Sequence, residues 1–335
     1  MSIREVAARA GVSPATVSRV FTQPQAVATE TRRRVMTAAE ELRYAPHPAA
    51  SSLARGRTGN LGIVVPDISN SFSAVVTKAV DRQARRDGYA LFVTGSDEVV
   101  HDEEASARAL AQQVDGLLLV SPLMPDDALL ALADMTPTVL LNRLLDGIPA
   151  VLTNLYAATG HAVEHLHALG HRTVTYLAGP DGYVNDVRLR GFRDACSRLG
   201  VDGSELGPFA ARFQDGVRAA DLVLATSETA VVAYNDEIAV GVVNRLADRG
   251  ITVPGDISVV GFDDTQLAEM VTPRLTTVRI PAAVAGTAAI EMLLDLIRGR
   301  EAGLRSPLEV SGELVVRSST GPARALPVPA QESAP

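Results

Sequence analysis

Few side chains in this 335-residue chain are spaced for chemistry. Four of its six histidines lie close together, and two pairs have the i,i+4 spacing that can hold a metal ion on one helix face: His161, His165, His167 and His171. The chain contains no Gly-x-x-x-x-Gly-Lys phosphate loop, no Gly-x-Ser-x-Gly nucleophile turn and no His-Glu-x-x-His metal motif. Its single cysteine, Cys196, excludes an internal disulfide and a cysteine-based metal site. The sequence therefore predicts no catalytic residues, no cofactor and no metal site. An enzyme is the first alternative to the function that the rest of the sequence indicates.

The charge distribution points to nucleic acid instead. Residues 1–60 contain nine arginines and four glutamates, a net charge of +5, whereas the remaining residues have a net charge of −13. A small basic end on a large acidic body is typical of a nucleic-acid-binding head, and a solvated charged helix is the alternative. With 47% hydrophobic residues and a net charge of only −8, the chain as a whole is not disordered. Its longest apolar runs are strand-sized, which excludes a membrane span, and the absence of an N-terminal apolar signal core predicts a cytoplasmic protein.

The basic end has the pattern of three short helices. Ser2 and Glu5 form a capping box, and Gly11 can end the first helix in a left-handed conformation. Ser13-Pro14 opens a second helix, since serine is a good N-cap and proline loses no hydrogen bond at the first helical position. A third helix is expected from about residue 30 to 42. Two short helices joined by a tight glycine turn and followed by a third predict a helix-turn-helix.

The second helix of such a motif presents its first turns to the major groove of DNA. Arg19 has the side chain to donate two hydrogen bonds to a guanine edge, and being a plain surface charge is its alternative role. Pro14 and Ala15 offer only apolar contact, and the hydroxyls of this helix suit phosphate oxygens. The predicted DNA-binding residues here are Ser13, Pro14, Ala15, Thr16, Ser18 and Arg19.

After a linker rich in proline and glycine at 45–60, apolar strands alternate with amphipathic helices. This alternation predicts parallel sheets with helices on both faces, in two halves. The fold class expected is therefore an all-α helix-turn-helix head followed by an α/β core of two Rossmann-like lobes, with a ligand cleft at the carboxyl ends of the strands. Residues 321–335 are expected to be a disordered tail. The strand candidates are 61–65, 89–94, 116–120, 138–141, 150–152, 173–177, 230–234 and 257–262.

The segment from Ile3 to Val20 closely resembles the N-terminal signature of the lactose-repressor (LacI/GalR) family of bacterial transcription regulators. It reads Ile-Arg-Glu-Val-Ala-Ala-Arg-Ala-Gly-Val-Ser-Pro-Ala-Thr-Val-Ser-Arg-Val. An ordered series of matches over residues 2–320 is far more specific than a helix-turn-helix alone. Five further segments match in order: Glu-Thr-Arg-Arg-Arg-Val at 30–35, Leu-Gly-Ile-Val-Val-Pro-Asp-Ile-Ser-Asn at 61–70, Val-Asp-Gly-Leu-Leu at 114–118, His-Leu-His-Ala-Leu-Gly-His at 165–171 and Ile-Ser-Val-Val-Gly-Phe-Asp-Asp at 257–264.

The resemblance implies an architecture and two partners. A head at 1–44 binds operator DNA, and a hinge helix at 45–60 places Leu53 in the minor groove, with Arg55 or Arg57 in the place of the family's usual arginine. The core at 61–320 resembles a periplasmic sugar-binding protein whose chain crosses between lobes. Members are usually homodimers on palindromic operators, which we expect here too. The lobe bounds implied are about 61–155 with 279–304, and about 156–278 with 305–320. The histidines at 165 and 171 belong to a family stretch, which argues against a metal site.

The same resemblance implies an effector site in the cleft. Arg188, Asn235 and Asp263 match ligand-binding positions of the family, and their side chains suit the hydroxyls of a sugar. For Arg188 and Asp263 the alternative is an ion pair between the lobes. Ala211 stands where an aromatic residue is frequent, and Ile280 where glutamine is, so the sugar class is less firmly implied. The predicted effector residues are Phe72, Ser73, Asn142, Arg188, Asn235 and Asp263.

These expectations combine into one function. The chain is predicted to be a transcriptional repressor whose affinity for operator DNA is controlled by a small-molecule effector, a sugar or sugar derivative. A transcriptional activator of the same family is one alternative. A sugar-binding protein without DNA regulation is the other, and both the DNA-binding head and the missing signal segment argue against it.

Overall fold

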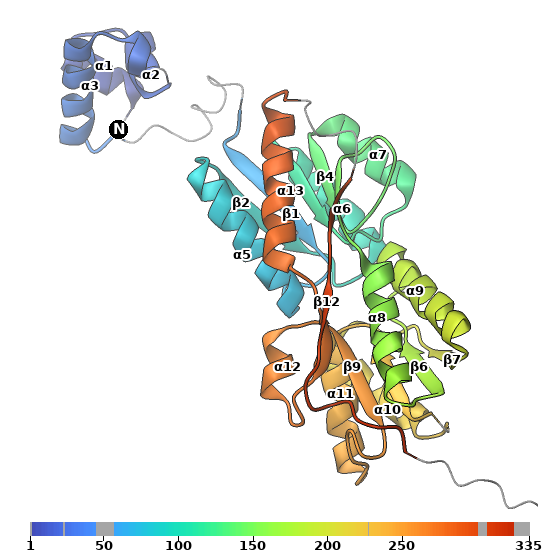
Figure 1. Cartoon of the computed structure of the whole chain (residues 1–335). Helices are drawn as coiled ribbons and strands as arrows, with labels where there is room; N and C mark the ends of the chain where they lie inside the picture. Colours follow the sequence, from blue (N-terminus) through green and yellow to red (C-terminus); the bar gives the residue numbers. More distant parts are fainter. Residues whose placement is uncertain (1, 23, 45–56, 227, 301–306, 325–335) are drawn as a thin grey trace, which may run out of the picture. The chain divides into compact units, whose positions relative to one another are not determined.

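The computed structural model describes residues 2–22, 24–44, 57–226, 228–300 and 307–324. The chain divides into two compact units (Figure 1). The first consists of residues 1–60 with 113–115 and contains the three N-terminal helices, and the second consists of the rest. No helix in the described part of the chain is both long and apolar enough to cross a membrane.

The N-terminal helices form as their local signals predict. Both bonds of the capping box between Ser2 and Glu5 are present, and Gly11 ends the first helix with φ 64°. The hydroxyl of Ser13 accepts a hydrogen bond from the amide of Thr16 at 3.1 Å, so it caps the second helix. Valines and alanines from all three helices form one buried cluster. The elements are α1 (Ile3–Ala10), α2 (Pro14–Thr22), the short 3-10 helix η1 (Pro24–Ala26) and α3 (Thr29–Glu41).

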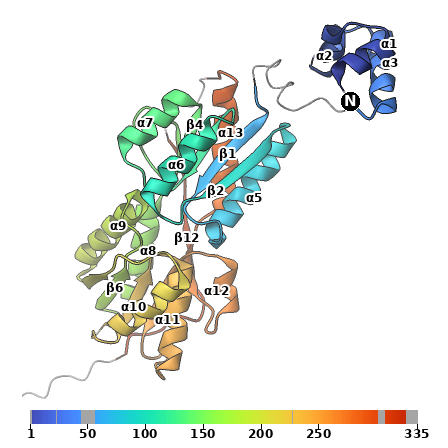
Figure 2. The same ribbon diagram turned by 180° about the vertical axis from the view of Figure 1, so that it is seen from behind.

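The first sheet of the second unit has six strands in the order β11-β5-β4-β3-β1-β2. The pairings β1–β3, β3–β4, β4–β5 and β5–β11 are parallel. Helices α5 and α13 share one buried cluster with this sheet, and α6 and α7 lie over its other face (Figures 1 and 2). The elements are β1 (Asn60–Val65), α5 (Ser71–Arg86), β2 (Ala90–Gly95), α6 (Val100–Ala111), β3 (Leu117–Val120), α7 (Asp126–Met135), β4 (Thr138–Leu141), β5 (Ala150–Thr153), α13 (Ala282–Ile297) and β11 (Leu308–Val310).

The second sheet also has six strands, in the order β12-β10-β9-β8-β6-β7, and only β12 is antiparallel to its neighbour among the registered pairs. Helices α8 and α9 pack on one face and α10 and α11 on the other. The predicted fold class is thereby confirmed. The elements are α8 (Leu155–Ala168), β6 (Thr173–Leu177), α9 (Tyr183–Leu199), β7 (Asp202–Leu206), α10 (Phe213–Val223), β8 (Ala230–Ala233), α11 (Asp236–Asp248), β9 (Ser258–Asp263), α12 (Gln266–Met270), β10 (Thr276–Arg279) and β12 (Glu313–Val315).

Two sequence-based boundaries need correction. Residues 308–310 pair with β5 in the first sheet, so the segment 305–320 does not belong to the second lobe as a whole. The chain passes into the second sheet only after β11, because β12 then pairs with β10. The expected tail is also ordered at its start, since Ala323 donates its amide to Leu169 at 2.9 Å and Arg324 pairs with Asp256 at 3.0 Å. The rest of that tail, 325–335, lies outside the described residues.

Candidate functional site

The first turns of α2 are free for contact. Pro14, Ala15 and Arg19 are exposed, whereas Val17 and Val20 on the opposite face are buried in the helical core. The two hydroxyl residues between them, Thr16 and Ser18, are partly buried. Among the described residues Arg19 has neither an ion-pair partner nor a hydrogen-bond partner, so its guanidinium is available to a ligand. Leu53 and Arg55, the other predicted DNA contacts, lie outside the described residues.

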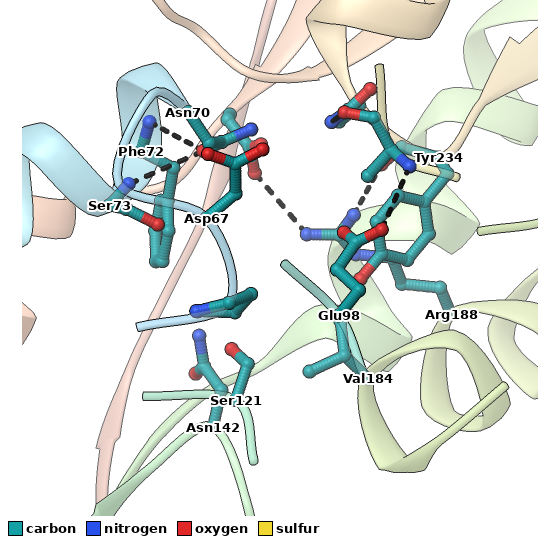
Figure 3. A pocket seen from close by; sticks show the side chains of 14 residues that line it. Asp67, Asn70, Phe72, Ser73, Glu98, Ser121, Asn142, Val184, Arg188 and Tyr234 are labelled. Atoms are coloured by element: carbon teal, nitrogen blue, oxygen red, sulfur yellow. Dashed lines mark hydrogen bonds and ion pairs between the residues drawn. The ribbon is translucent and has the colours of Figure 1, made fainter. Parts of the chain in front are cut away.

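The second unit contains a pocket where the carboxyl ends of strands from both sheets meet (Figure 3). The close-up shows side chains from the two sides of the pocket facing each other. The side of the first sheet contributes Asn70, Phe72 and Ser73, and the side of the second sheet contributes Arg188 and Tyr234. All six predicted effector residues line this pocket, as do two carboxylates that the sequence reasoning missed, Asp67 and Glu98. The lining residues are Pro66, Asp67, Asn70, Phe72, Ser73, Glu98, Ser121, Asn142, Val184, Arg188, Ala211, Tyr234, Asn235 and Asp263.

The backbone around the pocket is strained. Four non-glycine lining residues have a positive φ, a region that side chains with a Cβ rarely occupy: Glu98 at 64°, Ser121 at 47°, Asn142 at 57° and Asp263 at 102°. Each comes at or just after the end of a strand. Such strain persists only where surrounding contacts enforce it, and it gathers at functional sites. The conformation therefore supports assigning a function to this pocket.

Arg188 is the central cation of the pocket. Its guanidinium stacks on the rings of Phe262 and Tyr234, with its carbon 3.8 and 4.6 Å from their centroids. One terminal nitrogen donates to the backbone carbonyl of Tyr234, and the other lies 3.3 Å from Asp263. The buried Nε has no hydrogen-bond partner among the described residues. An acceptor on a ligand would satisfy it.

The ion pair between Arg188 and Asp263 is buried, with side chains only 6% and 9% exposed. Arg188 and Asp263 do form an ion pair, but both residues belong to the second lobe. The alternative of an ion pair between the lobes is therefore wrong. Burial is the largest influence on Asp263 and raises the pKa of its carboxyl, while the guanidinium of Arg188 opposes this rise. A ligand hydroxyl that reaches Asp263 thus meets a desolvated acceptor.

The two predicted amides have structural partners. The Oδ1 of Asn235 accepts from the amide of Ile238 at 2.9 Å and so caps α11, and its Nδ2 donates to Ala211 at 3.0 Å. The Oδ1 of Asn142 accepts from the amide of Thr153 at 3.0 Å. Both residues line the pocket. Their hydrogen bonds within the protein already engage the Oδ1 atom of each side chain and one Nδ2 hydrogen of Asn235. Their part in ligand binding stays a prediction.

Several polar contacts between described residues join the two sides of the pocket, and three of them are shorter than 3.5 Å. Glu98 accepts a hydrogen bond from the amide of Ala211 at 3.3 Å, and Asn70 donates to Glu237 at 3.1 Å. The third is an ion pair at 3.4 Å between Arg212 and Asp67. Asp67 lies two residues after the end of β1 and within one of the matched segments, so this position next to a strand end is a signal from which the sequence could have predicted it. Glu98 stands in no such motif.

The histidine cluster has another explanation. His171 is buried, and its two ring nitrogens lie within hydrogen-bond distance of Thr229 at 2.8 Å and Ser258 at 3.0 Å. His165 makes a similar contact with Thr320 at 2.9 Å. In the described part of the chain, no group of three or more histidine, cysteine or acidic side chains is arranged to hold a metal ion. His165 through Thr320, and His171 through the carbonyl of Gly321 at 3.1 Å, therefore join the C-terminal segment to the second lobe.

Comparisons with known proteins agree with this layout. Residues 2–47 match the family model of bacterial regulatory proteins, lacI family, and residues 163–320 match a periplasmic binding protein-like domain. The chain is 31% identical to the HTH-type transcriptional repressor CytR of Escherichia coli (strain K12), over 97% of each protein. Its structure is similar to the lac repressor dimer bound to operator and the anti-inducer ONPF, with a TM-score of 0.83, 28% identity and coverage of 96% of this chain and 99% of that one.

A second solved structure, the complex of the transcriptional regulator CelR with cellobiose, is 30% identical with a TM-score of 0.69, covering 95% of this chain and 99% of that one. These relatives span both units of the chain, the helical head and the two-lobed core. The family that the sequence signature suggests is thereby shown on separate grounds. The chain belongs to the LacI family of bacterial regulatory proteins.

Proposed function

We propose that this protein is a cytoplasmic, non-enzymatic transcriptional repressor whose affinity for a palindromic operator is controlled by a small carbohydrate in the pocket. The observation that carries the proposal is that both lobes line one pocket. A ligand can shift a conformational equilibrium only if it binds one arrangement more tightly than the other. A ligand that touches Phe72 and Asn142 on one side and Arg188 on the other would discriminate between lobe arrangements in this way.

The carbohydrate class is supported by the chemistry of the lining. Asp263, Arg188 and Glu98 supply acceptors and donors of the kind that hydroxyl groups bind, and Phe72 supplies an apolar surface. CelR, a relative of similar structure, is solved with cellobiose. Buried Ala211, in the place of a frequent aromatic residue, leaves Phe72 and Tyr234 as the aromatic rings at the pocket.

Homodimer formation and the division of labour along the chain belong to the same proposal. The head at 1–44 would bind DNA, the hinge at 45–60 would carry Leu53 and Arg55 to the minor groove, and the core would bind the effector and a second copy. The lac repressor of similar structure is solved as a dimer on its operator. A twofold dimer presents two heads to the two half-sites of a palindrome.

Arg19→Ala is expected to weaken operator binding by about 1–3 kcal/mol and to relax the base preference at one position of each half-site. The physical reason is that Arg19 is exposed, has no ion-pair partner among the described residues, and stands on the face of α2 that would enter the major groove. The measurement is fluorescence anisotropy with the operator and with single-base variants of it. Arg33→Ala, which removes an exposed arginine already paired with Glu30, is the control. An equal loss on every DNA sequence would make Arg19 a phosphate contact and refute its role in base recognition.

Operator affinity is expected to fall steeply with salt, by about a hundredfold or more between low and physiological ionic strength. The cause is release of counterions when the arginine-rich head neutralises phosphates.

Light scattering of the complex should show two protein chains on each palindromic duplex. One chain per duplex, or an affinity independent of salt, would contradict the proposed DNA-binding dimer.

A further inference from the structure

The pocket has more carboxylates than cations. Asp67, Glu98 and Asp263 line it, and Arg188 is the only arginine, lysine or histidine among the lining residues. The charge of Arg188 is offset by Asp263, and its two terminal nitrogens bond to Asp263 and to a backbone carbonyl, which leaves its Nε without a partner among the described residues. An anionic ligand would therefore meet one lining cation, and a carboxylate already lies beside it.

The cation at the rim is engaged as well. Arg212 lies 3.4 Å from Asp67 and 3.9 Å from Asp97. It therefore offsets the charge of Asp67, which lines the pocket. Glu98 has no such partner: no arginine, lysine or histidine nitrogen of the described residues lies within 4.0 Å of it. Its Oε2 accepts the amide of Ala211, and its Oε1 has no hydrogen-bond partner in the described part of the chain. Glu98 thus has an acceptor free for a ligand.

Two of the helix N-termini at the pocket are already capped by side chains. Exposed amides at a helix N-terminus commonly bind phosphate. Asn70 accepts from the amides of Phe72 and Ser73 at the start of α5, and Asn235 accepts from Ile238 at the start of α11. The starts of α6, α9 and α10 have no side-chain cap, so the case against an anion rests on the charge of the lining carboxylates.

Glu98 is held in place at a conformational cost. It follows Asp97, and both have a left-handed backbone, at φ 64° and 49°. The amide of Glu98 donates to the carbonyl of Pro66 at 3.2 Å, which fixes the loop against the end of β1. Burial is the largest influence on its carboxyl and raises the pKa. The hydrogen bond from Ala211 and the charge of Arg212 oppose this rise, and the charges of Asp67 and Asp215 make smaller additions to it. The strained loop therefore presents a partly desolvated carboxyl group to the pocket.

We propose that Glu98 is a specificity-determining residue, which accepts a hydrogen bond from a hydroxyl or ammonium group and makes the pocket reject phosphorylated and carboxylated sugars. This inference rests on the proposed carbohydrate function and narrows its ligand class to neutral and amino sugars. Repulsion from Glu98 acts in a partly desolvated cleft, where charges interact more strongly than in water.

The test uses full-length protein and matched sets of sugars. Each set contains a free sugar, its amino form, its phosphate and its uronate: glucose, glucosamine, glucose 6-phosphate and glucuronate, and the corresponding galactose compounds. Ribose with ribose 5-phosphate and cellobiose complete the panel. Thermal shift identifies binders, and calorimetry at neutral pH gives their dissociation constants. We expect the binders to be neutral or amino sugars, with the matched phosphate or uronate at least about tenfold weaker.

Two variants assign this selectivity to Glu98. Glu98→Gln keeps the shape and removes the charge, so it should weaken binding of the amino sugar by about tenfold and reduce the discrimination against phosphate. Asp97→Asn removes a charge from the adjacent residue, whose side chain is 79% exposed. This variant should change neither the affinity for the amino sugar nor the discrimination against phosphate by more than about twofold. A phosphate or uronate that binds as tightly as its neutral form, or a Glu98→Gln protein with unchanged selectivity, would overturn the inference. If no member of any set binds, the carbohydrate function itself is wrong.

Discussion

Arg188→Met is expected to lower the free energy of unfolding by about 3–5 kcal/mol, because it leaves the carboxylate of Asp263 buried without its partner. The same change removes the donor to the carbonyl of Tyr234 and the cation between two aromatic rings. It should also abolish the effect of ligand on operator binding, since Arg188 contributes to the pocket lining. Urea unfolding measures the first effect, and anisotropy with and without a sugar binder measures the second. Arg190→Met, an exposed arginine two residues along the same helix, is the control.

The loss should depend on pH in a defined direction. With Arg188 gone, nothing opposes the rise that burial causes in the pKa of Asp263, so the folded state holds a proton there to higher pH than the unfolded state does. Stability from this group is then present below its unfolded pKa of about 3.9 and is lost as the pH rises through the folded pKa. The deficit of Arg188→Met relative to wild type should therefore be larger at pH 8 than at pH 5.

The comparison with wild type removes the contribution of Glu103, whose pKa burial raises to about 7 and which titrates in both proteins. Asp236, whose pKa burial and the charge of Asp263 raise to about 7, titrates together with Asp263, so the difference reports on this coupled pair of carboxyls. Adding Asp263→Asn to Arg188→Met should remove the pH dependence of the deficit. A deficit that is equal at the two pH values, or no greater than that of Arg190→Met, would contradict the assignment of a buried, mutually dependent pair.

Gly191→Ala is expected to lower the free energy of unfolding by about 2–3 kcal/mol, although alanine is the better helix former. Gly191 lies on α9 where this helix touches α8, and an added Cβ would overlap the backbone carbonyl oxygen of Tyr156. Backbone atoms cannot rotate away as a side chain can, so the two helices must separate. Arg188 lies one turn earlier on α9, and its bonds to Asp263 should loosen in the same variant.

The same helix interface offers a matched control. Gly160 lies on α8, and its added Cβ would stand 4.0 Å from the Cβ of Ala195 on α9, an ordinary contact. Gly160→Ala should therefore raise the free energy of unfolding by up to about 1 kcal/mol through helix propensity alone. Urea unfolding of the two variants decides the matter. Equal changes in both proteins would show that close helix approach at Gly191 does not matter.

The helical head could be predicted from sequence almost completely. Its capping box at Ser2 and Glu5, its stop at Gly11 and its N-cap at Ser13 all act over three to five residues, so they are legible in the linear chain. The strands made of continuous apolar residues could also be recognised from the local sequence. A strand covered on both faces needs apolar side chains at every position. The eight predicted strands correspond to β1, β2, β3, β4, β5, β6, β8 and β9.

Four strands were not predicted, and each is short, polar or at a sheet edge. Residues 202–206 read Asp-Gly-Ser-Glu-Leu, a turn-like composition, yet they form β7 along β6. The three-residue strands β11 and β12 lie at the edges of different sheets, which is why the lobe boundary expected at 304 was misplaced. Such strands exist because a neighbouring strand supplies their hydrogen bonds, and that neighbour lies far away in the sequence.

The candidate site divides in the same way. Sequence by itself determined the residue types at the ends of the strands, and the family signature singled out six of them, all of which line the pocket. Only the tertiary structure decided how their bonding groups are used. Arg188 pairs with Asp263, Asn235 caps a helix, and Glu98, from a segment without any motif, joins the lining with an oxygen that has no partner among the described residues. The physical reason is that burial and partner choice depend on residues brought together from distant parts of the chain, whereas caps, turns and strand patterns depend on neighbours along it.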